Sequence, residues 1–210
     1  MAAEKMLELT KVVVCRGSWQ LDPVSFSLSK GKGLALVGAN GSGKSSLLEA
    51  VAGFLPVVSG QISISGTTVT ATADSPEPWQ RGIGWLGQQR GLWPHLTLRE
   101  QSQLFVGSSG LDKLSEYSAA LDLERLLDRH PGQLSGGEAQ RGELLRTLCS
   151  PAPLLLLDEP FSAQNPQQKL RVIEQLERER ESGRTILFAL HEPLAGVDSI
   201  SLDVEASESL

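Results

Sequence analysis

The sequence predicts an α/β fold built around a mainly parallel β-sheet. Short apolar runs alternate with helix-like segments along most of the chain, which is the pattern of α/β layer structures. Two of these runs, GLALVG at 33–38 and LLLLDEP at 154–160, show no alternation of apolar and polar residues, as expected for strands covered on both faces. With 210 residues, the chain can bury its own hydrophobic core as a single domain without support from a disulfide or a metal.

The N-terminal third is expected to combine antiparallel strands with the first strand and helix of the core. Residues 7–28 are typical of antiparallel strands, and so are residues 59–69, in which Ile62 and Ile64 alternate with polar residues. The GLALVG strand is followed by SSLLEAVAG at 45–53, which predicts a helix that ends at a glycine.

The middle of the chain loses the strand pattern. It becomes rich in helix-like segments such as TLREQSQLF and GGEAQRGELLRTLC. We therefore expect an inserted α-helical subdomain at 89–150. The core would be formed by residues 1–88 and 151–210 and would also carry the antiparallel β subdomain.

The C-terminal third predicts a strand, a helix and a second strand. The strand at 154–160 is followed by a helix at 165–183, for which Asn165 is the expected N-cap and Gly183 the expected end. A further apolar strand follows at 184–191. One face of the helix is expected to carry its apolar residues, Leu170, Ile173 and Leu176.

Composition and charge limit the classes of function. The net charge of −6 disfavours a broad surface for nucleic-acid phosphates, so we expect no nucleic-acid partner. Cys15 and Cys149 belong to no CxxC pair, which favours buried, reduced thiols. The N-terminus has no signal-peptide pattern, and no apolar run approaches the roughly 18 residues of a membrane span. A cytosolic chain that contacts a membrane only through a partner is expected.

The stretch GANGSGKS at 38–45 has the form of a phosphate-binding loop between a buried strand and a helix. Its glycines let the backbone N–H groups turn inward around an anion, while Lys44 can reach the β and γ phosphates and Ser45 can hold Mg²⁺. An ordinary glycine-rich turn is the alternative, which the position between strand and helix disfavours. The expected nucleotide-binding residues are Gly38, Asn40, Gly41, Ser42, Gly43, Lys44, Ser45 and Ser46.

Two carboxylates follow the four leucines of the LLLLDEP strand. Asp158 is expected to hold Mg²⁺, and Glu159 to polarise the water that attacks the γ-phosphate. An exposed acidic turn is the alternative, but a buried strand makes that placement less favourable.

A second glycine-rich turn, LSGGEAQR at 134–141, also runs into a predicted helix. Its residues Ser135, Gly136 and Gly137 would direct backbone N–H groups and the positive helix end towards an anion. A simpler interpretation is a capping box, in which Ser135 caps the helix and Glu138 reaches back to it. The two interpretations are compatible.

These three motifs, with Gln88 in GWLGQQ and His191 in FALHE, occur in an order that resembles the ATP-binding-cassette (ABC) ATPases over nearly the whole chain. The resemblance implies a P-loop NTPase core and an ATPase subunit that binds ATP and Mg²⁺. It implies that two such subunits, a homodimer or a pair of related ATPases, close around two nucleotides and drive a separate transmembrane permease. The subunit would then lie at the cytoplasmic face of the inner or plasma membrane.

The resemblance also assigns roles to individual residues. Gln88 would join the core to the helical subdomain and touch Mg²⁺ or the attacking water. His191 would contact the γ-phosphate and hold the geometry of Glu159. The turn at 135–137 would close over the nucleotide held by the partner subunit.

Two positions depart from the family pattern. Asn165 stands where the family has an interface aspartate, so that the N-cap oxygen is kept but the charge is lost. Arg16 stands before Gly17 where an aromatic residue normally stacks on adenine. A guanidinium can also stack on a base, and Trp19 lies three residues further on.

Three functions remain in competition at this point. A transporter ATPase is favoured, and residues 89–101, with Trp93, Pro94 and Leu96, would form its groove for a helix of the permease. A soluble ATPase of an assembly complex, such as iron-sulfur cluster assembly, is the second. A non-hydrolysing interaction subunit is the third, suggested by Asn165 and disfavoured by Glu159 and His191.

Overall fold

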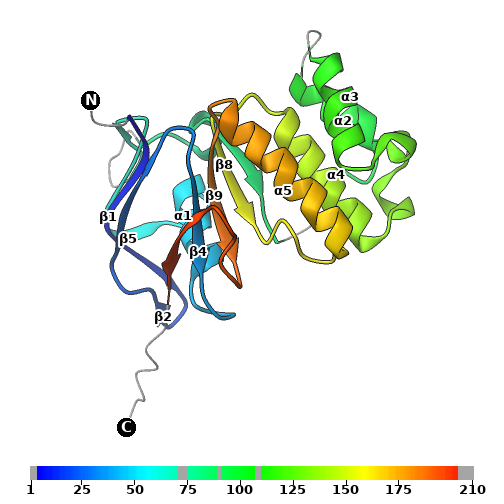
Figure 1. The fold of residues 1–210 in the computed structure, drawn as a ribbon. Helices are drawn as coiled ribbons and strands as arrows, with labels where there is room; N and C mark the ends of the chain where they lie inside the picture. The colour runs from blue at the N-terminus through cyan, green and yellow to red at the C-terminus, as the bar shows by residue number, and fades with distance from the viewer. Residues whose placement is uncertain (1–3, 71–74, 89–90, 107–109, 203–210) are drawn as a thin grey trace.

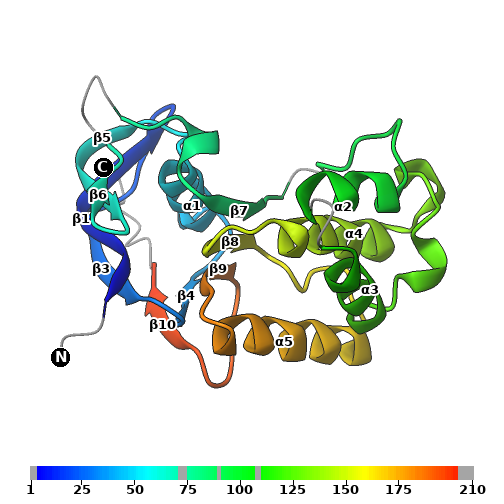
Figure 2. The ribbon, with the colours of Figure 1, turned by 90° about the horizontal axis from the view of Figure 1, so that it is seen from above.

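The computed structural model describes residues 4–70, 75–88, 91–106 and 110–202. Two β-sheets and a group of helices lie next to one another, with the antiparallel sheet at one end, the parallel sheet in the middle and most helices at the other end (Figures 1 and 2). The predicted α/β fold is confirmed.

The central sheet has the strand order β10-β4-β9-β8-β7, and each pair of neighbours is parallel. Parallel strands end at the same edge of a sheet, so the segments that follow them meet there. The strands are β4 (Gly33–Val37), β7 (Ile83–Leu86), β8 (Leu154–Asp158), β9 (Thr185–Leu190) and β10 (Asp198–Ser201).

The four leucines of β8 explain why this strand shows no polar alternation. Leu154 and Leu156 belong to the hydrophobic core that includes helix α1 (Lys44–Ala52). Leu155 and Leu157 belong to the second core, on the side of helix α5 (Pro166–Glu181). The two helices cover opposite faces of the sheet (Figure 2), so every residue along the strand is buried.

The second sheet is antiparallel, as predicted from residues 7–28 and 59–69. Strand β1 lies at its centre and pairs with β2, β3 and β5, while β6 pairs with β5. Its strands are β1 (Lys5–Arg16), β2 (Trp19–Gln20), β3 (Val24–Ser29), β5 (Val57–Ile64) and β6 (Thr67–Thr68).

The helices between β7 and β8 pack against one another beyond the end of the parallel sheet (Figure 1). They are α2 (Leu98–Val106), α3 (Leu111–Ala120) and α4 (Gly136–Cys149). Short 3₁₀ turns lie at 78–80, 124–126 and 131–133. Within the part of the chain that the structure describes, no helix combines the length and apolarity needed to cross a bilayer.

The expected buried face of α5 is partly wrong. Leu170 is 60% exposed, and Ile173 is only half-buried, whereas Leu176 is buried as predicted. The helix instead buries Val172, Leu176 and two polar residues, Gln175 and Glu179. A pattern of apolar residues cannot predict this face, because half of it is polar.

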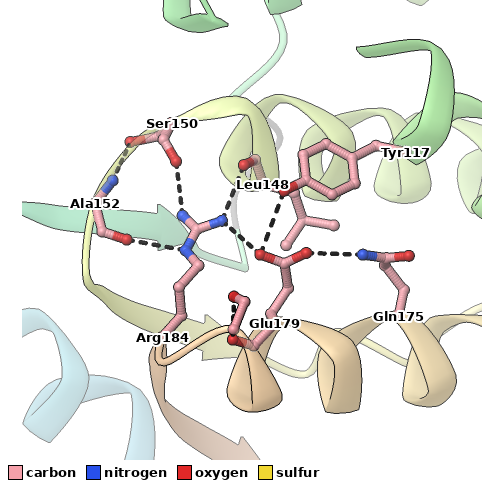
Figure 3. A network of polar contacts seen from close by, with 8 residues as sticks. Tyr117, Leu148, Ser150, Ala152, Gln175, Glu179 and Arg184 are labelled. Carbon is pink, nitrogen blue, oxygen red and sulfur yellow. Dashed lines mark hydrogen bonds and ion pairs between the residues drawn. The ribbon is translucent and has the colours of Figure 1, made fainter. Parts of the chain in front are cut away.

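A network around Glu179 explains how the polar residues are buried (Figure 3). The Glu179 carboxylate pairs with Arg184 at 3.0 Å and accepts hydrogen bonds from Gln175 at 2.7 Å and from the Tyr117 hydroxyl at 3.3 Å. Burial, and then the Glu179 charge, raise the pKa of Tyr117 to about 12. A buried charge is tolerated when it is paired and hydrogen-bonded.

The same network ties four elements together. The Arg184 guanidinium, just before β9, also donates to backbone carbonyls at and just after the end of α4 (Figure 3). These are the carbonyls of Leu148 (2.9 Å), Ser150 (2.7 Å) and Ala152 (3.0 Å). The C-terminal end of α4 is therefore fixed to α5, β9 and, through Tyr117, α3.

Both cysteines are free, as predicted, but only one of them is buried. Cys149 lies in the core, and burial raises the pKa of its thiol to about 12. Cys15 is half-buried, which corrects the expectation that both thiols are buried, because it lies near the hairpin end of β1.

Candidate functional site

A cavity of about 840 Å³ lies where β4 and β8 end and α1 begins. The structure brings most of the predicted site residues to its wall, from segments far apart in the sequence. These are Arg16, Asn40, Gly41, Gly43, Lys44, Ser45, Ser46, Gln88, Gly136, Asp158, Glu159 and His191. Four predicted residues are not part of the wall: Gly38, Ser42, Ser135 and Gly137.

The loop between β4 and α1 needs glycine at defined positions. Gly41 and Gly43 have φ angles of 82° and 97°, in the left-handed region that favours glycine. A Cβ on Gly43 would lie 2.4 Å from Cη2 of Trp19, so the indole packs directly against the loop. Gly38 is enclosed, because a Cβ there would lie 2.7 Å from Oγ of Ser42. Gly38 and Ser42 therefore shape the loop from behind its binding face.

The Lys44 side chain crosses the loop from inside. Its Nζ donates to the carbonyls of Gly38 at 2.7 Å and Ala39 at 2.8 Å. Burial lowers the pKa of Lys44, and the nearby Glu159 and Asp158 charges oppose this shift. The ammonium is thus held at the centre of the loop, where an anion would meet it.

A buried carboxylate faces a hydroxyl and an amide at the end of β8. Among the described residues, the Asp158 carboxylate is buried and its Oδ1 has no hydrogen-bond partner. Burial raises the pKa of Asp158 although a hydrogen bond from Ser45 lowers it. Gln88 donates from Nε2 to Oγ of Ser45 at 3.0 Å. This set of oxygen ligands, with an anionic oxygen left over, fits a hard divalent cation.

Glu159 has an unusual backbone conformation that points its side chain into the cavity. Its φ angle is 48°, and its N–H donates to the Ala189 carbonyl on β9 at 3.0 Å. Its Oε1 lies 2.9 Å from Nε2 of His191, which follows β9. The two predicted catalytic side chains therefore contact each other, as the family resemblance implied.

The second glycine-rich turn forms the predicted capping box at the start of α4. The N–H of Glu138 donates to Oγ of Ser135 at 3.3 Å, and Oε2 of Glu138 accepts from the N–H of Ser135 at 2.7 Å. Ser135 and Gly136 are exposed, and Gly136 reaches the edge of the cavity. The first N–H groups of a helix have no partner within it, so this turn presents donors outward.

Several cavity residues were missed by sequence reasoning. Gln140 and Glu143 line the cavity from α4, and Ser162 and Ala163 line it from the turn after Glu159. The spacing of Gln140 and Glu143 after the glycine-rich turn puts them on one helix face, and this signal could have found them. Trp19, which the sequence indicated only as a possible base-stacking residue, also lines the cavity, and its contact with the loop depends on a hairpin register that the sequence does not give.

A loop that can surround an anion, a lysine inside it and a carboxylate with a spare oxygen meet the needs of a nucleoside triphosphate and its metal ion. Together with the parallel sheet, they define a P-loop nucleoside triphosphatase.

Comparisons with known proteins identify the family. A family model described as ABC transporter matches residues 21–162. The chain is 37% identical over 187 residues to the thiamine import ATP-binding protein ThiQ of Histophilus somni, covering 85% of each chain. It is 41% identical over 181 residues to ThiQ of Photobacterium profundum, covering 81% of this chain and 73% of that one.

Solved structures agree with this result. One chain of the post-hydrolysis dimer of the ATP-binding cassette MJ0796, bound to ADP and Pi, superposes with a TM-score of 0.78 at 27% identity, covering 89% of this chain and 88% of that one. The chain belongs to the ABC transporter family. It is an ATP-binding and ATP-hydrolysing subunit of such a transporter, and the assembly-complex alternative is not favoured.

Proposed function

We propose that the 840 Å³ cavity holds one ATP with Mg²⁺ and that its residues carry out the hydrolysis. The observation that carries the proposal is the buried Asp158 carboxylate, whose Oδ1 lacks a partner among the described residues. A buried anionic oxygen is costly unless a ligand satisfies it. A magnesium ion shared with the phosphates would do so and would neutralise charge that develops during phosphoryl transfer.

The proposed roles follow from position. Lys44 and the N–H groups of the loop bind the β and γ phosphates. Ser45, Asp158 and Gln88 would hold Mg²⁺. Glu159 orients the attacking water and accepts its proton.

His191 supports the carboxylate. Its Nε2 lies 2.9 Å from Oε1 of Glu159, at the mouth of the cavity. From there it holds the rotamer of Glu159 and can donate to the γ-phosphate.

Two variants test these assignments. Glu159→Gln should reduce turnover by about 10²- to 10⁴-fold and leave ATP binding intact, because it removes only the general base. Lys44→Ala should weaken ATP binding itself. A Glu159→Gln protein that still hydrolyses ATP at the normal rate would contradict the assigned base.

We further propose that two subunits close around two nucleotides. Ser135 and Gly136 are exposed at the start of α4, and the MJ0796 cassette forms a dimer in its solved structure. Each turn would cover the γ-phosphate held by the other subunit. The Glu159→Gln protein with Mg-ATP should sediment as a dimer, and adding Ser135→Arg should keep it monomeric. A Glu159→Gln protein that stays monomeric at high concentration would overturn this proposal.

A separate permease is the proposed membrane partner, with the subunit held on the cytoplasmic face. The aromatic rings of Trp93 and Phe105 stack with centroids 6.2 Å apart, and Leu104 beside them is 65% exposed. Pro94 is exposed and Leu96 half-buried, while residues 89 and 90 lie outside the described residues. Such a patch is typical of a contact surface. Trp93→Glu should abolish copurification with a co-expressed permease without reducing the ATPase rate of the isolated chain.

The names of the relatives suggest a cargo. Two relatives at 37% and 41% identity are thiamine import proteins, so we propose thiamine as the transported solute. Uptake of labelled thiamine by cells that express this chain with its permease should stop with Glu159→Gln. Uptake that is unchanged while the ATPase is blocked would exclude this cargo.

Base stacking is proposed for Trp19, with Arg16 at the rim. The two residues are opposite each other in the β1–β2 hairpin, and both line the cavity. Arg16 forms an ion pair with Glu49 of α1, whereas the indole of Trp19 packs against Gly43. The base of the nucleotide would therefore stack on the indole ring of Trp19 rather than on the Arg16 guanidinium.

A further inference from the structure

The side chain of Gln140, on the first turns of α4, hydrogen-bonds the turn that carries Glu159. Its Nε2 donates to the carbonyl oxygen of Glu159 at 2.8 Å and to the hydroxyl of Ser162. The Ser162 hydroxyl in turn donates to the same carbonyl at 3.1 Å. Gln140 and Ser162 therefore clamp the backbone of Glu159 from one side.

This clamp acts on a backbone conformation that needs support. Glu159 has a φ of 48° and Ala163 a φ of 57°, and both are residues with a Cβ in the left-handed region. Such residues stay in that region only when their surroundings hold them there. The direction of the Glu159 side chain follows from its backbone, so the clamp also sets where the carboxylate meets His191.

A second contact joins the start of α4 to the same turn. A Cβ on Gly137 would lie 2.6 Å from the carbonyl oxygen of Ala163, so the two backbones touch and only glycine fits between them. Closely packed groups transmit displacement rather than absorb it. A shift of the 135–137 turn would therefore reach the segment from Glu159 to Ala163 at two points.

The rest of α4 is fixed to the core. Glu143 accepts from the N–H of Gly91 at 2.7 Å, and Thr147 donates to the carbonyl of Trp85 on β7 at 3.0 Å. The end of the helix is bound by Arg184 (Figure 3). Movement of α4 is thus constrained at its C-terminal half, whereas the contacts of Gln140 and Gly137 connect its N-terminal turn to the turn that carries Glu159.

We propose that Gln140 is a positioning residue that couples the two nucleotide sites of the dimer. Through it, closure of the 135–137 turn over the partner's ATP sets the orientation of Glu159 towards the ATP of its own chain. The inference rests on the proposed dimer. The contact through Gln140 would connect the two sites without residue 165, which is the uncharged Asn165 in this chain.

The first measurement is the ATPase kinetics of Gln140→Leu, which keeps the bulk of the side chain but removes its hydrogen bonds. Misplacement of a catalytic group by about 1 Å can cost about 10²-fold, so we expect kcat to fall at least about tenfold while KM for ATP changes less than about twofold. The control is Gln103→Leu, an exposed glutamine on α2, which should leave both constants unchanged.

Two further measurements distinguish the proposed positioning role of Gln140 from a purely structural role. In the Glu159→Gln background, Gln140→Leu should still give the ATP-dependent dimer, because only the orientation of Glu159 is disturbed. Ser162→Ala removes the hydroxyl of the clamp without removing apolar bulk, and it should lower kcat in the same way by a smaller factor. This second variant keeps the test valid if Gln140→Leu folds poorly.

A double-mutant cycle tests whether the coupling between the 135–137 turn and Glu159 passes through Gln140. If Ser135→Ala and Gln140→Leu interrupt the same coupling, the double variant should lose less kcat than the product of the two single losses. The inference would be overturned if the kcat loss of the double variant equalled the product of the two single losses. A Gln140→Leu protein with normal kcat would also overturn it. Failure of the proposed function is distinct from this, because the wild-type chain would then lack ATPase activity or the Glu159→Gln chain would not dimerise.

Discussion

Replacing Asp158 by asparagine should make the nucleotide-free protein more stable and the Mg-ATP-bound protein less stable. The carboxylate is buried, burial raises its pKa, and its Oδ1 has no partner among the described residues. A buried unsatisfied polar group costs about 1–3 kcal/mol, and more when it is charged. Asp158→Asn removes the charge but keeps a polar amide, so we take the lower end, about 1 kcal/mol. For a domain of this size that is a rise in Tm of roughly 2–4 °C.

The gain in stability of nucleotide-free Asp158→Asn over wild type should depend on pH. A folded-state pKa above the unfolded value means that Asp158 favours folding at low pH and loses that contribution as the pH rises through the folded pKa. The advantage of Asp158→Asn should therefore be largest at pH 7–8 and should shrink as the pH falls towards the raised pKa of the carboxyl.

The ligand should reverse the order of stability. At 100 times Kd, a ligand stabilises the native state by about 2.7 kcal/mol, or roughly 5–11 °C here. We expect wild type to gain this shift with Mg-ATP and Asp158→Asn to lose most of the magnesium-dependent part. Thermal unfolding in EDTA, in ATP with EDTA and in Mg-ATP measures this. Asp112→Asn, at an exposed position on α3, is the control and should stay within about 0.5 kcal/mol of wild type in all conditions. A lower Tm for Asp158→Asn in EDTA, or a gain that stays constant as the pH falls through the raised pKa of the Asp158 carboxyl, would refute this reasoning.

Three further predictions follow from other parts of the molecule. Trp19→Ala should raise KM for ATP about tenfold or more, since base stacking on an aromatic ring contributes about 1–3 kcal/mol, and an unchanged KM in steady-state assays would exclude this role. Glu179→Ala should lower the free energy of unfolding by about 3 kcal/mol, because it leaves the half-buried Arg184 without its carboxylate partner, and urea denaturation with Glu179→Gln as the milder variant measures it. In the native protein at pH 8, a thiol reagent followed by absorbance should modify Cys15 well before Cys149, whose pKa is raised to about 12 by burial. Equal rates for the two thiols would contradict the burial of Cys149.

The fold could be predicted wherever one residue pattern had one physical explanation. The four leucines of β8 predict a strand buried on both faces, and the two hydrophobic cores on its sides are the reason. The α5 face failed because Gln175 and Glu179 are buried through the Arg184 network, and periodicity assigns polar residues to the surface. Pairing across about 60 residues, as between Tyr117 and Glu179, leaves no local trace in the sequence.

The candidate site also contains residues that could be placed from the sequence and residues that could not. The loop at 38–45 and Asp158 could be placed from sequence, because parallel strands bring their ends to one edge. Trp19 could only be named as a possible base-stacking residue, since its contact with Gly43 requires the β1–β2 register. The spacing of Gln140 after the glycine-rich turn could have placed it at the cavity, but its role could not be predicted, because that role arises from the left-handed backbone of Glu159 that it holds.

Asn165 keeps the helix-capping role of the family's aspartate but not its charge. Its Oδ1 accepts from the N–H of Gln168 at 2.9 Å, so it caps α5 as an aspartate would. The cap is needed by each single chain and is kept, whereas the charge would act only across the proposed dimer interface and is lost. If the two proposed sites are coordinated without that charge, a contact within the fold of each chain has to connect them. The bond from Gln140 to Glu159, and the contact of Gly137 with Ala163, join the turn proposed to face the partner to the turn that carries the proposed catalytic base.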